Sequence, residues 1–490
     1  MTVFWRLVLP LVLLGCVAEG APIQVSAAFH VHTSSFSTGE LSLEELIREA
    51  QRKRIGALIL TENLLLRFEY GLFPLRGVVR RVVERPSLAQ TGVEAYLRAL
   101  DAAQARFPDV ILVPGVEVVP YYYWTGSLFT RDLTMWEGQK NLLIVGLSRP
   151  EDYERLPVIG SSRSSAPGVE GFLKLALGLV AMIGGVGLLR RRRERAVRLT
   201  HFTVRVQKRY RAPGWMALAV GGLLAADAVA SPALNPYRGN LGVAPYQAVI
   251  DAAESRGGMA FWSFPEARDL SQESVGRLGT VTIRTDPYPD ALLQSHGYTG
   301  FGAIYPDTTT VTEPGRQWDR LLGEYARGRR SRPAWGIGEL GYHGPPKPLD
   351  EALTILWVPE RSRPAVLRSL RDGRFYAVRP RSDFQLRLDD LSIGQEGSTG
   401  WAPMGGELAA TGPERILVRL RLSASDGRAV PVSARLIRDG RVVAEVQGTT
   451  PFEAVVPGEP PAPGAREFVR LEATQPHWLL SNPVFVRRAP

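Results

Sequence analysis

Two histidines near the N-terminus, His30 and His32, could bind a metal ion, because they follow a short apolar run two residues apart. Residues 23–29 form this run, and their composition predicts a buried strand. Side chains alternate between the faces of a strand, so residues two apart point the same way. Two imidazoles on one face can hold a metal between them, although two pocket histidines without metal share this spacing.

Apolar runs that resemble strands alternate with helical stretches along much of the chain, and polar residues follow several of the runs. Ser42 and Glu45 form a capping box, which predicts a helix between the first two runs. Seven strands separated by helices predict a β/α barrel, whose chemistry lies at the C-terminal ends of its strands. The runs are residues 23–29, 57–60, 110–113, 142–146, 259–264, 301–305 and 334–337.

The order of the motifs resembles the polymerase-and-histidinol-phosphatase (PHP) superfamily over roughly residues 22–160 and 237–345. The resemblance implies a distorted seven-stranded barrel that holds two or three divalent metals and hydrolyses phosphoesters. The motifs that carry it are Phe29-His30-Val31-His32-Thr33, Ser42-Leu43-Glu44-Glu45-Leu46, Thr61-Glu62-Asn63, Pro114-Gly115-Val116-Glu117 and Phe261-Trp262-Ser263-Phe264-Pro265-Glu266.

Four residues match ligand positions of that family, and the resemblance implies that they bind metal: His30, His32, Glu117 and His343. Glu62 and Glu339 are auxiliary candidates. Nitrogen and oxygen ligands of this kind suit Zn, Mn or Fe, and the set is large enough for one or two divalent ions. No residue is assigned as general acid or base, so the catalytic residues are unknown.

Three departures from the family pattern reduce the expected ligand set. A ligand histidine of the family becomes Asn63, the histidine of a His-Pro pair becomes Phe264, and the aspartate of an Asp-x-His motif becomes Gly341. A vestigial pocket that binds a ligand without chemistry is therefore the alternative to an enzyme.

An aromatic run, Tyr122, Tyr123 and Trp124, follows Glu117 closely. These rings could form a wall over the metal pocket and stack on a substrate, or they could simply pack within a loop.

The net charge of +10 is concentrated in one segment, because residues 190–211 contain nine arginines and one lysine against one glutamate. Little excess charge is left for a basic face elsewhere, so we expect no nucleic-acid partner. The segment lies between two apolar stretches rich in glycine and alanine, at about residues 171–189 and 215–230, which are long enough to span a membrane. The positive-inside rule then places the basic loop, residues 190–213, in the cytoplasm and both flanks outside. A buried soluble hairpin with an exposed basic loop is the alternative.

Residues 1–21 resemble a bacterial export signal, with Arg6 before an apolar core and a possible lipobox at Cys16. Cleavage after Ala18-Glu19-Gly20 is the alternative to lipidation. As Cys16 is the single cysteine, an internal disulfide is excluded.

The sequence predicts five segments. A signal peptide (1–21) precedes the first barrel half (22–160), the linker and membrane hairpin (161–236), and the second barrel half with its connection (237–382). The alternating pattern of residues 416–422 and the turn at Asp439-Gly440 predict an antiparallel β-sandwich over residues 383–490.

We therefore expect a membrane-attached bacterial protein whose barrel and sandwich lie on the extracytoplasmic side. Its expected function is metal-dependent hydrolysis of a phosphorylated small molecule or envelope component. A catalytically inactive ligand-binding or scaffold protein is the alternative.

Overall fold

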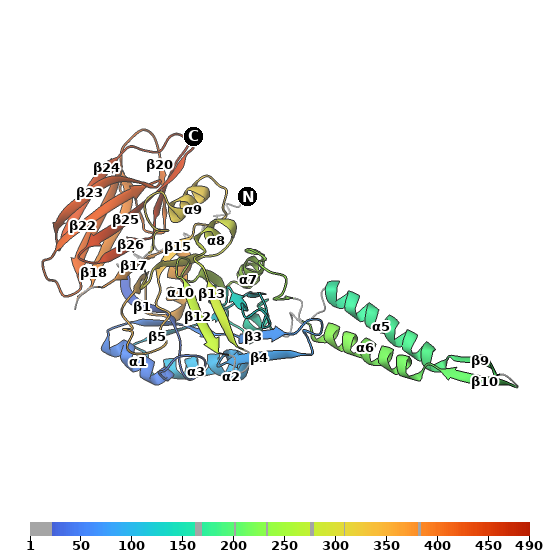
Figure 1. Ribbon diagram of the computed structural model, residues 1–490. Helices are drawn as coiled ribbons and strands as arrows, with labels where there is room; N and C mark the ends of the chain where they lie inside the picture. Colours follow the sequence, from blue (N-terminus) through green and yellow to red (C-terminus); the bar gives the residue numbers. More distant parts are fainter. Residues whose placement is uncertain are drawn as a thin grey trace, which may run out of the picture.

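The computed structural model describes residues 22–161, 169–199, 202–231, 234–274, 279–307, 309–380 and 384–490. The predicted signal peptide with Cys16, and most of the predicted linker, lie outside the described residues. The described chain is a mixed α/β structure in which most strands belong to one 15-stranded sheet (Figure 1).

The seven strands predicted from the apolar runs are all present, and they lie next to one another in chain order. They are β1 (Ile23–Val31), β2 (Ala57–Asn63), β5 (Ile111–Val118), β8 (Leu142–Val145), β11 (Met259–Trp262), β14 (Gly300–Ile304) and β15 (Trp335–Gly338). A regular β/α barrel has only parallel strands, whereas β8 runs antiparallel to both β5 and β11.

The two ends of this seven-strand path meet, because the segment after β15 returns to β1. Leu340 N donates to the Phe29 carbonyl at 3.0 Å, and His32 N donates to the Tyr342 carbonyl at 2.9 Å. These bonds bring the residues that follow β15 beside the end of β1. Polar side chains that follow β15 therefore lie close to those at the end of β1.

Helices cover this part of the sheet. The capping box at Ser42 is present at the start of α1 (Leu43–Arg52), as predicted, and α1 buries Leu43, Leu46, Ile47 and Ala50. The others are α2 (Leu88–Thr91), α3 (Val93–Arg106), α4 (Pro150–Glu154), α7 (Ala244–Glu254), α8 (Pro289–Gln294), α9 (Gln317–Ala326) and α10 (Arg363–Asp372).

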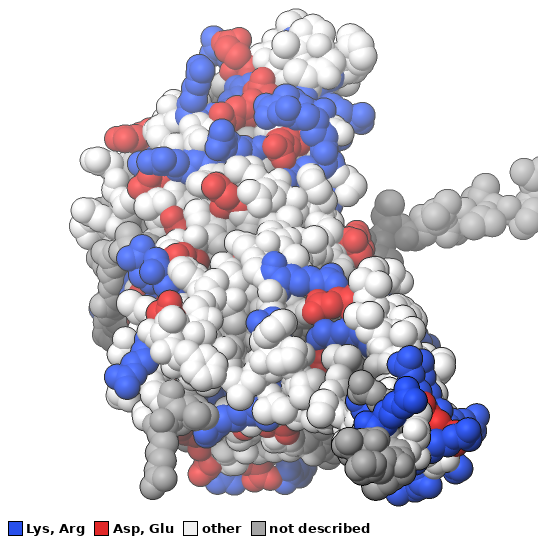
Figure 2. All heavy atoms as spheres, turned by 45° about the vertical axis from the view of Figure 1, so that its right-hand side comes forward, with Lys and Arg blue, Asp and Glu red and all other residues white. Residues whose placement is uncertain are grey.

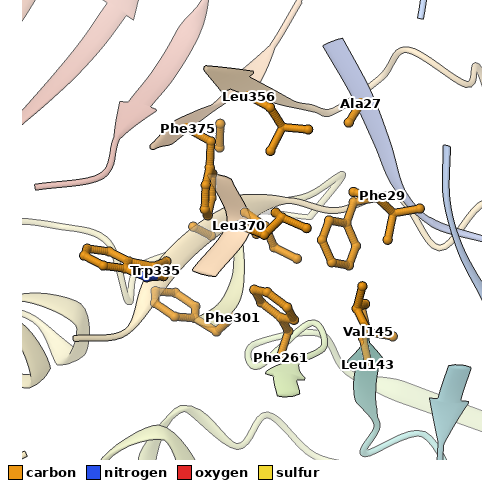
Figure 3. Packing of buried hydrophobic residues seen from close by; sticks show 14 of the residues in the cluster. Ala27, Phe29, Leu143, Val145, Phe261, Phe301, Trp335, Leu356, Leu370 and Phe375 are labelled. Carbon is orange, nitrogen blue, oxygen red and sulfur yellow. The ribbon is translucent and has the colours of Figure 1, made fainter. Parts of the chain in front are cut away.

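Apolar side chains from distant strands fill the core of the molecule (Figure 3). Phe29 of β1 packs edge-on against Phe261 of β11, with ring centroids 5.2 Å apart. Phe301 of β14 packs edge-on against Trp318 of α9 at 5.8 Å. Strands far apart along the sheet thus share one core, which is what a strongly curved sheet requires.

The same sheet continues past β1 into the C-terminal third of the chain. Its further strands, in order of pairing, are β16 (Leu353–Val358), β17 (Phe375–Arg379), β26 (Trp478–Ser481), β25 (Arg466–Gln475), β22 (Pro431–Arg438) and β23 (Arg441–Thr449). Off this path, β27 (Val484–Arg488) pairs with β25, and β20 (Glu407–Ala410) pairs with β27. A second sheet contains β19 (Trp401–Pro403), β18 (Leu386–Gln395), β21 (Ile416–Ala424) and β24 (Phe452–Gly458). The strands of the predicted sandwich are therefore joined by backbone pairing to those of the predicted barrel.

Two long helices, α5 (Val169–Arg190) and α6 (Arg211–Ala230), form an antiparallel pair that projects from the body (Figure 1). Both are long and apolar enough to cross a membrane, with a mean hydropathy of 2.1 and 1.4 over their most apolar windows. At 1.5 Å per residue they are about 33 and 30 Å long, which matches a hydrocarbon core of about 30 Å. Only 11% and 22% of those windows are buried, so these helices differ from the core helices of a soluble protein.

The predicted basic loop between these helices contains regular structure. Its described residues form the antiparallel ribbon of β9 (Arg192–Leu199) and β10 (Phe202–Arg209). Figure 2 shows basic side chains gathered at the lower right, where this ribbon comes forward, whereas both signs of charge are mixed over the rest of that face.

Two small sheets border the body on the side of the α5–α6 pair. One is the hairpin of β3 (Leu66–Gly71) and β4 (Arg80–Arg85). The other has the order β12 (Asp269–Ser274), β13 (Thr280–Thr285), β7 (Thr134–Trp136) and β6 (Tyr123–Thr125). They interrupt the expected alternation of strand and helix, and they form the walls of the cavity described below.

Candidate metal centre

His30 lies at an irregularity in β1 that directs its side chain. The pairing of β1 with β2 shifts register between Phe29 and Val31, and His30 has a φ of 67°. A non-glycine residue in this left-handed region costs roughly 1–2 kcal/mol, and bulges of this kind re-aim side chains. The structure therefore maintains a strained backbone at the first of the two sequence-predicted histidines.

His30, His32 and Glu117 come together in the structure. The Nε2 atom of His30 lies 3.2 Å from Glu117 Oε1, and the Nε2 atom of His32 lies 3.5 Å from Glu117 Oε2. The two rings are 5.1 Å apart, and one ligand atom from each of the three residues lies within 4.8 Å of the others. All three side chains are buried. Two imidazoles and a carboxylate in this arrangement suit a divalent transition metal.

The other ring nitrogen of each histidine is already occupied. Nδ1 of His30 lies 2.7 Å from Glu339 Oε1, and Nδ1 of His32 lies 3.3 Å from Ser37 Oγ. In contrast, Nε2 of His30 and Nε2 of His32 are buried without a hydrogen-bond partner among the described residues. Metal-binding histidines have this pattern, since one nitrogen is held by a carboxylate or hydroxyl and the other faces the ion.

Within the cluster, protonated His30 is paired with the ionised carboxylate of Glu117. Burial opposes a charge on His30, but Glu117 and Glu339 outweigh it and raise the pKa of His30 to about 9. Burial favours the neutral form of Glu117, but His30 above all, with His32 and His343, lowers its pKa to about 2. Burial places the pKa of His32 well below its ordinary value. The positive charge of protonated His30 thus stabilises the ionised Glu117 carboxylate. A bound metal cation would supply this positive charge in place of the proton.

Each oxygen of Glu117 also accepts a hydrogen bond from an amide. Asn63 Nδ2 donates to Oε2 at 2.6 Å, and Asn141 Nδ2 donates to Oε1. Asn63, which the sequence resemblance placed at a ligand position, orients Glu117 in this structure. The sequence interpretation missed Asn141, although its place directly before the apolar run of β8 was a usable signal.

The two auxiliary candidates differ in their relation to the cluster. Glu339 holds His30, and it also accepts hydrogen bonds from Ser263 Oγ and, at 3.1 Å, from Phe264 N. Glu62 instead accepts from Thr33 N, Thr33 Oγ1 and Ser37 Oγ. Burial raises the pKa of Glu62 to about 7, against the effect of these bonds. Both glutamates therefore support the histidines from behind rather than joining the three-residue cluster.

His343 lies beside the cluster and outside it. Its ring stacks on His32 with centroids 4.4 Å apart and planes 2° apart, and its Nδ1 lies 3.2 Å from Thr38 Oγ1. Burial lowers the pKa of His343, which keeps the ring neutral near pH 7. His343 is thus placed to contact a ligand, because it lines the cavity above the cluster.

Phe264 and Gly341 are the other two positions at which the sequence differs from the expected motif pattern, and they lie against each other. The Phe264 ring stacks on His30 with centroids 5.3 Å apart. A Cβ atom on Gly341 would lie 2.9 Å from this ring, and Gly341 has a φ of 56°. Phe264 therefore fills the space that a longer residue at position 341 would need.

A cavity of about 760 Å³ opens above the cluster. Of the three aromatic candidates, Trp124 lines this cavity. Tyr122 is buried, and its hydroxyl accepts a hydrogen bond from Glu69 N at 2.8 Å. Tyr123 stacks on Trp136 at 6.1 Å. Trp124 is thus the member of the run that is placed to meet a ligand.

Comparison with known proteins finds similarity to solved structures and none to sequence families. No family model matches the sequence, and no curated protein matches it. A two-domain protein from Bacteroides vulgatus, described as containing a predicted PHP-like metal-dependent phosphoesterase, is similar over 92% of this chain and 91% of its own chain. The two are 12% identical, with a TM-score of 0.34. At this level of similarity, the assignment of the site depends on its own geometry.

Proposed function

We propose that this protein binds one divalent metal ion through His30, His32 and Glu117 and hydrolyses a phosphoester at that centre. One observation carries the proposal. Among the described residues, the Nε2 atoms of His30 and His32 are buried without a hydrogen bond of good geometry, and both face one buried carboxylate, that of Glu117. An unpaired buried polar atom costs about 1–3 kcal/mol. His32 Nε2 is such an atom, whereas His30 Nε2 is paired with Glu117 only while His30 is protonated, so a cation in place of that proton would satisfy both nitrogens.

The residues around the cluster define the roles that the chain itself can supply. Glu339 and Ser37 fix the ring orientation of the histidines, and Asn63 and Asn141 fix the carboxylate. A divalent ion held there would supply Lewis acidity toward a phosphoryl oxygen and lower the pKa of a water molecule. His343 and Thr38 lie on the cavity side, where they can contact a phosphoryl group, and the Thr38 hydroxyl donates to Asn63 Oδ1 at 2.9 Å.

The same geometry supports one ion in preference to two. Asn63 occupies one oxygen of Glu117 with its amide, and Phe264 places an apolar ring against His30. Those two positions would have to supply ligands for a second ion. Zn, Mn and Fe all accept two imidazoles and a carboxylate.

A non-catalytic role is the second candidate, and Phe264 favours it. Its ring covers one face of His30 and reduces the space for a water molecule beside the cluster. In that case the cavity would bind a phosphorylated ligand without turnover, as a receptor or scaffold does.

We further propose that the α5–α6 pair anchors the protein in the bacterial cytoplasmic membrane with its body on the extracytoplasmic side. The length and exposure of both helices support the anchor. The basic β9–β10 ribbon between them supports this orientation, since positive charge is retained in the cytoplasm.

Metal analysis of the purified full chain, combined with turnover of phosphomonoesters and phosphodiesters, tests the function. We expect about one equivalent of transition metal, and we expect His30→Ala and Glu117→Ala to lose it together with turnover by at least about 100-fold. His296→Ala is the matched control, because His296 is exposed and lies outside the cluster.

The result separates the two candidates. Bound metal without turnover on any phosphoester would favour the binding protein. Wild-type protein that remains free of metal after incubation with Zn²⁺, Mn²⁺ and Fe²⁺ would overturn the metal centre itself.

A further inference from the structure

The cavity above the cluster has a polar floor and mainly apolar walls, which also contain charged side chains and the polar residues Gln139, Ser271, Ser274 and Thr285. The floor is formed by His30, Thr38, Asn63, Glu117, Asn141 and His343. Its volume of about 760 Å³ is much larger than a phosphate group requires, and it lies within the range of sites for whole small molecules. The ligand therefore has a sizeable part beyond the phosphoryl group.

The walls show what that part is made of. In the β3–β4 hairpin every second residue faces the cavity, so Phe68 on β3 and Val83 on β4 line it together. Leu133, Met135 and Ile283 line the opposite side, from β7, β13 and the segment before β7. Val83 remains 40% exposed, which leaves apolar surface open to a ligand. Walls of this kind bind a hydrocarbon chain better than a sugar.

Positive charge accompanies the apolar walls. Arg81 and Arg268 line the cavity, and neither has an ion-pair partner within the ranges that the structure covers. Arg85 is paired with Glu273, and Asp269 is the remaining carboxylate in the wall. Arginines without partners beside an apolar wall suit a ligand that is anionic at one end.

The β3–β4 hairpin connects this cavity to the membrane helices. Its turn is held at the end of α6, where Gly77 N donates to Asp227 Oδ1 at 2.6 Å and Arg80 Nη1 donates to the Ala230 carbonyl at 3.4 Å. Figure 1 shows β3 and β4 extending from the body toward the base of this pair. The turn also exposes apolar side chains, including Phe73, which is 80% exposed.

Exposed apolar residues at the end of a membrane helix are placed to enter the lipid interface. The exposed apolar residues of the turn between β3 and β4 are Leu72, Phe73, Val78 and Val79. The hairpin thus lies with its turn at the membrane surface and its strands in the cavity wall. A molecule with a hydrocarbon chain and a charged end could move along this hairpin from the bilayer to the metal centre.

We propose that the ligand of this site is a lipid-type phosphoester, with its phosphoryl group at the His30–His32–Glu117 cluster and its hydrocarbon chain between the β3–β4 hairpin and the β12–β13–β7–β6 sheet. This inference rests on the proposed function and specifies its substrate class. In the hydrolysis, a water oxygen forms a bond to phosphorus and the phosphorus–oxygen bond to the lipid alcohol breaks. One water proton ends on the released alcohol, and the phosphate retains the other oxygen atoms.

A series of alkyl phosphates tests the inference, because methyl, butyl and octyl phosphate share one head group and differ in chain length. The full chain in lipid nanodiscs is assayed for kcat/KM, and binding of each ester to the metal-free protein is measured by calorimetry. We expect both quantities to rise at least about tenfold from methyl to octyl phosphate, because each buried methylene contributes favourably. Adenosine monophosphate serves as a phosphomonoester with a polar, rigid body in place of the alkyl chain.

One pair of variants makes the test specific to the wall. Val83→Glu places a charge in the cavity wall and should abolish the dependence on chain length, both of kcat/KM and of binding. Val82→Glu is the matched control, since Val82 lies on the same strand and faces away from the cavity. It should leave the dependence on chain length intact.

The outcomes of the two proposals can be told apart. Bound metal and turnover without any dependence on chain length, or tighter binding of adenosine monophosphate than of octyl phosphate, would overturn the lipid inference and leave the metal centre standing. Chain-length-dependent binding without metal or turnover would support the lipid site and overturn the proposed hydrolysis.

Discussion

The protonation of His30 connects the metal centre to the stability of the protein. Its pKa is raised to about 9 in the folded state by Glu117 and Glu339, which outweigh its burial, against an ordinary value of 6.5. A raised folded pKa stabilises the fold fully below pH 6.5, and this contribution is lost as the pH rises toward 9. For metal-free protein we expect a loss of at most about 3 kcal/mol between pH 7 and 9.

Thermal midpoints of chelator-treated protein at pH 7, 8 and 9 measure this loss. His30→Gln should flatten the decline, whereas His296→Gln, at an exposed position, should not. Metal affinity should rise over the same range, because an ion must displace the proton on His30. An equal decline in wild type and His30→Gln would show that another group controls it.

Gly341 gives a second prediction at this scale. Gly341 and Gly397 both have a left-handed backbone, with φ values of 56° and 80°. An alanine Cβ at position 341 would also clash with the Phe264 ring, whereas nothing lies within 4 Å of a Cβ at position 397. We expect Gly341→Ala to destabilise the protein by about 1–3 kcal/mol more than Gly397→Ala, measured as a change in thermal midpoint. Adding Phe264→Ala should recover part of the difference, and no recovery would mean that the ring is not the obstacle.

The ligand residues of the site were accessible from sequence to different degrees. His30, His32 and Glu117 follow apolar runs, so their convergence could be predicted once the runs were assigned to neighbouring strands. The sequence could not show that Glu62 turns toward Thr33 and Ser37, because that depends on the path of the loop after His32. Nor does spacing reveal that Phe264 and Gly341 fit each other, since they are 77 positions apart in the sequence and only packing brings them together.

The α5–α6 pair is held together by glycines at its crossing points. A Cβ on Gly221 would lie 2.5 Å from the Gly178 carbonyl, and a Cβ on Gly185 would lie 2.9 Å from the Gly214 carbonyl. Small residues at such positions let helices approach closely in a membrane, where packing supplies much of the attraction. The expected membrane hairpin therefore has a packing interface of its own.

Substitution at this interface should separate the helices. We expect Gly221→Leu to lower the heat tolerance of the detergent-solubilised chain, followed as the fraction that stays monodisperse after heating. Gly222→Leu is the control, because nothing lies within 4 Å of a Cβ at Gly222. Equal loss in both variants would argue against close helix packing.

Regular elements were predicted best where the apolar period is long and uninterrupted. α1 has a clear helical period, whereas the seven strands, α5 and α6 are continuous apolar runs. The β9–β10 ribbon was expected to be a loop, because its arginines mask the alternation that pairs Arg192–Leu199 with Phe202–Arg209. The β3–β4 hairpin was missed for a similar reason, since β4 carries three arginines and a glutamate among six residues.

The proposed orientation of the whole molecule in the membrane can be measured with single cysteines. Lys208 lies in the basic ribbon and Glu453 lies exposed on β24 of the predicted sandwich. An impermeant maleimide added to intact spheroplasts should label Glu453→Cys and spare Lys208→Cys until the membrane is opened. The wild-type chain gives the background from Cys16. The reverse pattern would place the body in the cytoplasm.

The unbroken backbone pairing from β1 through β16 and β17 to β26 makes the last hundred residues part of one mechanical unit with the site. Asn482 reinforces the junction, because it accepts from Gly336 N at 2.8 Å and donates to the Phe375 carbonyl at 2.9 Å. A chain that ends near residue 382 would bare the outer edge of β17, which is a template for aggregation. We expect such a truncated chain to be insoluble, and we expect the full chain to melt in a single transition. Evolution can therefore change the outer strands only while they still cover the edge of β17.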